Sequence, residues 1–72
     1  MNRIYLVYQI IDGVPSTDYN AFAQYLYAKK FAEQTALALA NEEPVIIQLD
    51  ENNMIRFCWG NSKVCIDILE VQ

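Results

Sequence analysis

The sequence predicts an α+β fold, in which a single helix packs on one face of a four-stranded, mostly antiparallel sheet. Apolar residues recur at the helical period in one stretch only, from Tyr19 to Asn41. After Pro44 the chain alternates between short apolar runs and polar turns, which is typical of strands and hairpins. The predicted order is therefore β-α-β-β-β, in one small domain that spans residues 1–72.

The first predicted strand is Ile4–Ile11. Both of its faces are largely apolar, as expected of a central strand or one covered on both sides. We assign one face to the core, with the residues Ile4, Leu6, Tyr8 and Ile10. A turn is predicted at 12–15 from its Asp-Gly-Val-Pro composition.

The helix is predicted over Tyr19–Asn41, with a stripe of mostly small side chains toward the sheet. The stripe consists of Ala21, Tyr25, Ala28, Ala32, Ala36 and Leu39. An alternative keeps Tyr19–Ala23 extended and starts the helix near Gln24. The end is better defined, because Asn41 suits a left-handed C-cap and Pro44 disfavours helix at the residue before it.

Three strands are predicted after the helix, at Val45–Leu49, Met54–Gly60 and Val64–Val71. The position of the first strand among them stays open. Beside the second or fourth strand it would be parallel, and beside the third strand it would be antiparallel. No rule for strand order decides among these without contacts.

The register of the two hairpins follows from matching their apolar faces. A two-residue turn at 61–62 pairs Trp59 with Val64. In the preceding hairpin, a three- or five-residue loop sets Leu49 opposite Ile55, whereas a two-residue loop brings apolar residues opposite polar ones.

One helix covers only one face of this sheet, so the other face is predicted to stay open. More than half of its residues are apolar, which indicates a binding surface or an oligomer interface. The predicted open face consists of Tyr5, Val7, Gln9, Ile11, Ile46, Gln48, Met54, Arg56, Cys58, Lys63, Cys65, Asp67, Leu69 and Val71. A second candidate surface is the aromatic helix start around Tyr27. The candidate protein-binding residues are Tyr5, Val7, Ile46, Met54, Arg56, Asp67, Leu69 and Tyr27.

No catalytic or ligand motif stands out in the sequence. Histidine is absent, which removes the usual general base near neutral pH and the commonest metal ligand. The predicted register makes Cys58 and Cys65 cross-strand neighbours, but without an export signal reduced thiols are expected. The acids at 42–43 and 50–51 lie in predicted loops, where carboxylates are ordinarily solvated. We therefore predict no enzyme, no cofactor and no metal site.

The charge of the chain favours a protein partner over nucleic acid. Nine acids against five bases give a net charge of −4, which disfavours phosphate binding and is compatible with a basic or nucleic-acid-binding protein. Tyr5, Arg56 and Lys63 lack the Gly-aromatic signature of an RNA-binding sheet. No apolar run approaches the ~20 residues of a membrane span, and the first residues do not resemble a signal peptide. A cytoplasmic protein without direct membrane contact is expected.

These features predict a small acidic protein-binding module that inhibits or regulates a larger protein by covering its surface. Phage-encoded antagonists of host defence systems, such as anti-CRISPR proteins, are similar in general size, acidity and architecture. That similarity is an analogy, and it assigns no role to any residue. The alternative is a homo-oligomeric structural or assembly subunit, for example a homodimer, that uses the open sheet face as its symmetric interface.

Overall fold

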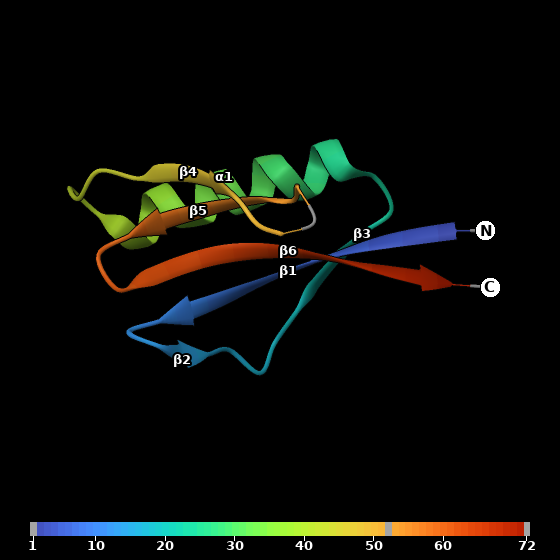
Figure 1. Cartoon of the computed structure of the whole chain (residues 1–72), viewed down its shortest axis with the longest axis horizontal. Helices are drawn as coiled ribbons and strands as arrows, with labels where there is room; N and C mark the ends of the chain where they lie inside the picture. Colours follow the sequence, from blue (N-terminus) through green and yellow to red (C-terminus); the bar gives the residue numbers. More distant parts are fainter. Residues whose placement is uncertain (1, 52, 72) are drawn as a thin grey trace.

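The computed structural model describes residues 2–51 and 53–71, which form one α-helix against one antiparallel sheet (Figure 1). The elements are β1 (Asn2–Ile11), β2 (Val14–Pro15), β3 (Asn20–Phe22), α1 (Tyr25–Ala40), β4 (Ile46–Leu49), β5 (Ile55–Trp59) and β6 (Ser62–Val71). The predicted α+β class and the packing of one helix on the sheet are confirmed. The prediction of four strands is wrong, because the sheet has six strands over the described residues. Within these residues, no helix is both long and apolar enough to cross a membrane.

The strands are arranged in the order β2-β1-β6-β5-β4, and β3 lies on the same edge of β1 as β2. Every pair of strands is antiparallel. The first strand lies beside the last one, which was one of the positions left open, but the expectation that it would be parallel in that position is wrong. The reason is an additional reversal, since β2 and β3 carry the chain back along β1 before α1 begins (Figure 1).

The helix begins at Tyr25, so of the two predicted starts the later one is correct. Gln24 precedes it with extended backbone angles, φ −126° and ψ 136°. Residues 20–22 pair with β1 instead of extending the helix, and they satisfy backbone groups on an edge of β1 that would otherwise be unpaired. The helix ends at the predicted place, with Asn41 following Ala40 at a positive φ of 58°. The ψ of Asn41 is −110°, so its conformation is not the predicted left-handed C-cap.

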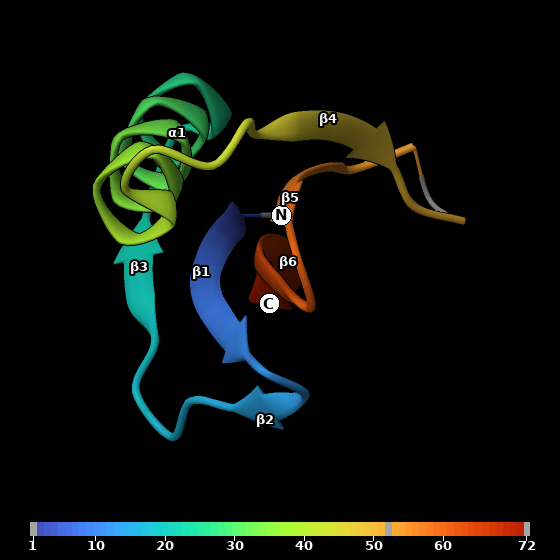
Figure 2. The same cartoon turned by 90° about the vertical axis from the view of Figure 1, so that its left-hand side faces the viewer.

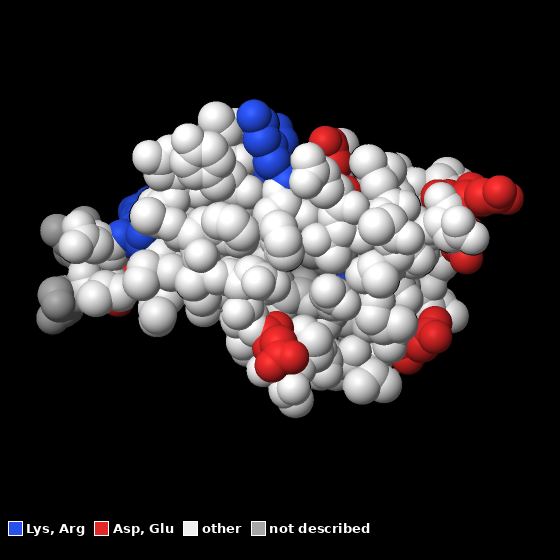
Figure 3. Space-filling view, turned by 180° about the vertical axis from the view of Figure 1, so that it is seen from behind, with Lys and Arg blue, Asp and Glu red and all other residues white. Residues whose placement is uncertain are grey.

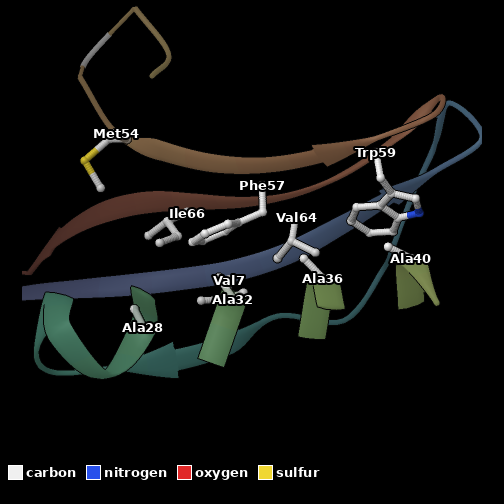
Figure 4. Close-up of a cluster of buried hydrophobic side chains, with 10 residues drawn as sticks. All are labelled: Val7, Ala28, Ala32, Ala36, Ala40, Met54, Phe57, Trp59, Val64 and Ile66. Atoms are coloured by element: carbon white, nitrogen blue, oxygen red, sulfur yellow. The ribbon is translucent and has the colours of Figure 1, made fainter. Parts of the chain in front are cut away.

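The core lies between α1 and the three central strands β1, β6 and β5 (Figure 4). The helix contributes four alanines, Ala28, Ala32, Ala36 and Ala40, and the sheet contributes the larger side chains Val7, Phe57, Trp59, Val64 and Ile66. Small residues on the helix let its axis approach the sheet closely. Burial of each larger side chain stabilises the fold by about 1.5–3 kcal/mol.

The face of β1 that meets the helix is opposite to the predicted one. Val7 is 1% exposed and lies in the core, while Leu6 and Tyr8 point to the other side of the sheet. Pairing with β6 determines this orientation, because Val7 lies opposite Ile66, whose side chain also faces the helix. Both faces of β1 are apolar, so its own alternation did not distinguish them.

The hairpin between β5 and β6 turns one residue earlier than predicted, at 60–61 instead of 61–62. Trp59 consequently pairs with Ser62 and not with Val64. The pairing shifts by two residues, which leaves each side chain on its predicted face. Gly60 has a φ of 49° at the first turn position, where two-residue hairpins of type II′ favour glycine.

The hairpin between β4 and β5 has the predicted register, with Leu49 opposite Ile55. The connection spans 50–54, which corresponds to the five-residue loop considered above. Asn53 adopts a positive φ of 61°, as an asparagine in a tight reversal can. Asn52, which belongs to the predicted loop, lies outside the described residues.

Candidate protein-interaction surfaces

The sheet face opposite α1, here called the outer face, is covered by no helix of the described chain (Figure 2). Strand alternation and register assign Asn2 and thirteen further residues to it, and most of the thirteen are apolar. They are Ile4, Leu6, Tyr8, Ile10, Ile46, Gln48, Arg56, Cys58, Lys63, Cys65, Asp67, Leu69 and Val71. The prediction of an open, largely apolar face therefore agrees with the fold, although β1 contributes different residues.

Tyr8 lies near the middle of the outer face and packs against Tyr19, with the ring centroids 5.4 Å apart. Burial is the main reason that the pKa of Tyr8 is raised to about 12, and nearby Cys65 and Asp67 raise it further. Burial also raises the pKa of the Cys65 thiol, against a smaller lowering by its hydrogen bond with Tyr8. Both groups are thus protonated near neutral pH, and the Cys65 thiol is poorly suited to act as a nucleophile.

The two cysteines are both free, and they do not lie directly opposite each other. Cys58 pairs with Lys63 and Cys65 pairs with Arg56, so the predicted direct pairing is wrong. The two-residue shift of the hairpin makes the cysteines diagonal neighbours, for which Cα atoms are typically ~7–8 Å apart. The Cys58 thiol instead lies 3.6 Å from the side-chain oxygen of Gln48 on β4.

Arg56 connects the outer face to the loop after β4. Its guanidinium lies 3.8 Å from the Asp50 carboxylate. Asp50 also accepts a hydrogen bond of 2.9 Å from the backbone N–H of Met54, so it closes its own loop. The Arg56 Nε is buried and has no hydrogen-bond partner in the described part of the chain. Arg56 therefore positions the loop and is only partly available to another molecule.

Four of the predicted binding residues are at the surface. Ile46 and Leu69 are 59% and 49% exposed on the outer face. Asp67 is exposed near Leu69 on β6, whereas Ile46 lies at the other end of the face, in line with Cys58 and Lys63. Tyr27 is exposed on α1, away from the outer face. The structure therefore brings Ile46, Asp67 and Leu69 onto one face and leaves Tyr27 apart.

Three other predicted binding residues do not lie on the open surface. Val7 is in the core, and Tyr5 faces the helix side with its ring 5.5 Å from that of Tyr25. Met54 is also buried. The expectation that Val7 and Tyr5 lie on the outer face is wrong, because β1 presents its opposite face to the helix.

A further apolar surface lies on β4, on the face opposite to the predicted open face. Ile47 and Leu49 lie on the helix side of the sheet but are 57% and 64% exposed. The helix makes no contact with β4, which projects away from it (Figure 2). A helix is ~10 Å wide and strands lie ~4.8 Å apart, so one helix covers only two or three strands of a sheet. That comparison of widths could have predicted the exposure of β4.

The opposite side of the molecule, where α1 and β3 lie, has its charged residues mainly around the rim (Figure 3). Uncharged side chains occupy the middle of this view. Exposed Tyr27 is one of the large apolar residues of α1. Of the predicted binding residues this side has only Tyr27, whereas the outer face has Ile46, Asp67 and Leu69.

Comparison with protein families, curated proteins and solved structures found no match. The function must therefore be argued from the surfaces described above. No group of three or more potential metal ligands occurs among residues 2–51 and 53–71. What the arrangement offers chemically is apolar contact area, a few hydrogen-bonding and charged groups on the outer face, and an unpaired strand edge at β4.

Proposed function

We propose that this chain is a protein-binding module without catalytic activity, which inhibits or regulates a larger protein by covering part of its surface. The observation that carries the proposal is the outer face, a largely apolar sheet surface with no helix over it. Soluble domains rarely leave a contiguous apolar patch of this kind without a partner. An antagonist of a host defence system is the most concrete version, and it rests on analogy of size and acidity.

The proposed contact surface combines residues of β1, β6 and β4 on the outer face. Leu69 and Ile46 provide exposed apolar contacts, and Asp67 provides a charge for a basic partner. Tyr8 adds a large side chain with a protonated hydroxyl, a combination that is enriched at interface hot spots. Contact by a preformed sheet face needs little rearrangement of the backbone.

The alternative function, a homo-oligomeric subunit, uses the same face. A two-fold axis would place two outer faces against each other, and the apolar residues of both would be removed from water. The two functions differ in the state of the purified chain, since only self-association makes the outer face inaccessible before a partner is added.

The test uses the immobilised chain to capture proteins from an extract of its native cell, with Leu69→Lys as the disabling variant. A captured protein that Leu69→Lys loses supports the proposal. Val14→Lys is the matched control, because Val14 is exposed at the opposite edge of the sheet and should leave binding unchanged. Retention of the same protein by Leu69→Lys would exclude the outer face as the contact surface.

A further inference from the structure

The strand β4 is a short, exposed sheet edge that has no charged residue and no proline. It is the last strand of the sheet and pairs only with β5 in the described chain. Natural edge strands usually carry charges, prolines or bulges that prevent another strand from adding. The four residues of β4, Ile46–Leu49, include no charge and no proline, and all four are exposed.

The helix side of β4 has apolar side chains that lie beside β5 but are not covered by the helix. Ile47 and Leu49 lie on the same sheet face as α1, but the helix packs over β1, β5 and β6 and does not contact β4. A strand added beside the free edge of β4 would continue the sheet by one strand. Its alternate residues would then lie next to Ile47 and Leu49.

Acidic residues stand at both ends of β4. Between Asn41 and Ile55 the sequence contains Glu42, Glu43, Asp50 and Glu51, and it contains no lysine or arginine. A hollow beside Asp50 is lined by three acids, Asp50, Asp67 and Glu70, together with Arg3, Met54 and Ile68. Arg3 and Arg56 are paired with Glu70 and Asp50, so neither base is left to balance the exposed Glu51 and Asp67.

A second copy of the chain fits this edge poorly. In a two-fold antiparallel arrangement, pairing Ile47 with Ile47 of the second copy would match the apolar faces. The same arrangement brings the acidic turns that flank β4, with Glu43 before it and Glu51 after it, close to those of the second copy at both ends of the pair. Like charges brought close together in this way repel each other, so they disfavour the pair. The edge is therefore complementary to a strand with basic ends and not to itself.

We propose that β4 binds an extended segment of the partner protein as an added strand, apolar at alternate positions and flanked at each end by lysine or arginine. This inference rests on the proposed function and specifies the partner more narrowly. Backbone hydrogen bonds to the free edge supply affinity, and the alternate apolar residues and basic ends supply selectivity.

The test uses a synthetic peptide with the core Val-Thr-Ile-Thr-Val between lysine pairs. Its comparison peptide has the same core between glutamate pairs, and a third has proline at the centre of the lysine-flanked core. Nuclear magnetic resonance of the labelled chain should show slower amide exchange and shifted signals in β4 with the first peptide only. Binding of the glutamate peptide with equal affinity, absence of binding by the lysine peptide, or shifts confined to the outer face would overturn the proposal.

Two variants, each with a matched control, test whether Ile47 and Glu51 contribute to peptide binding. Ile47→Lys should weaken binding of the lysine peptide about tenfold or more, while Val14→Lys, which adds the same charge at the opposite edge, should not. Glu51→Gln is the milder change and should weaken binding about two- to fivefold, the size expected from an exposed ion pair. Glu33→Gln removes the same charge from the exposed surface of α1 and should have no effect.

The peptide experiment and the capture experiment can fail separately. If the peptide does not bind β4 but Leu69→Lys still abolishes capture, the proposed function stands and β4 is not its strand-pairing site. If Leu69→Lys and Ile47→Lys both retain the captured protein, neither surface makes the contact. Loss of capture with Ile47→Lys alone would place the partner on β4 and not on the outer face.

Discussion

At the scale of the residue, the side of the sheet on which Val7 lies determines which side chains of β1 reach the outer face. Leu6, Val7 and Tyr8 are all apolar, so each could have been a core residue. The pairing of Val7 with Ile66 directs Val7 into the core and leaves Leu6 and Tyr8 on the outer face. A large part of the candidate site is thus decided by one register.

The raised pKa of Tyr8 predicts a loss of stability at alkaline pH. Tyr8 is neutral when protonated, and its pKa is about 12 in the folded chain against 10.0 as the ordinary value. Its contribution is therefore fully present below pH 10 and is lost as the pH rises toward 12. The free energy of unfolding, measured with urea between pH 8 and pH 12, should fall over the upper part of this range.

The variant Tyr8→Phe separates the titration of Tyr8 from that of the other tyrosines, the lysines and the Cys65 thiol. The variant lacks the hydroxyl and should lose less stability than the original chain between pH 10 and pH 12. Parallel pH profiles for the two proteins would contradict the assignment of the shift to Tyr8.

At the scale of the element, residues 12–22 distinguish the observed sheet from the predicted one. Asp12 and Gly13 have φ values of 51° and 83°, the pattern of a type I′ turn, and they reverse the chain onto the edge of β1. Ser16 then donates a backbone hydrogen bond of 2.7 Å to the Gln9 carbonyl. The Asp12 N–H donates to the Ser62 hydroxyl at 3.0 Å, which attaches this turn to the start of β6.

Gly13→Ala should destabilise the chain through the backbone alone. A Cβ at Gly13 would meet no atom within 4 Å, so there is space for the methyl group. The positive φ is unfavourable for alanine by about 1–2 kcal/mol. Urea unfolding should show a loss of about this size, with Gly13→Asn, which tolerates positive φ better, in between. Equal stability of the alanine variant would mean that the turn does not hold this conformation in solution.

At the scale of the whole molecule, the uncovered surfaces and the acidic charge have opposite effects on self-association. The outer face and β4 favour contact with another chain, whereas the net charge of −4 and the acids at both ends of β4 oppose pairing of two identical copies. A partner with basic groups satisfies both features, which is why the proposals specify a different protein.

The purified chain should therefore be a monomer of 8.3 kDa. Light scattering over a concentration series measures its molar mass, and repetition at high salt tests whether charge alone prevents association. A stable dimer at low salt would contradict the expectation and favour the homo-oligomeric function. The outer face would then be covered by the second copy, and partners would have to bind elsewhere.

The sequence by itself determined the features that depend on neighbouring residues. It predicted the alanine stripe through Ala28, Ala32 and Ala36, the helix end at Asn41 and the register of Leu49 with Ile55. Helical period, capping and short hairpin loops are local properties, and their signals lie within a few residues. The open sheet face also followed, since one helix cannot cover two faces.

The tertiary structure alone decided which residues form the candidate surfaces. The face of β1 was ambiguous because both sides are apolar, and residues 20–22 could extend the helix or pair with β1. The exposure of Ile47 and Leu49 depends on where the helix lies across the sheet. Each choice depends on pairing between residues far apart in the chain, and no local pattern contains that information.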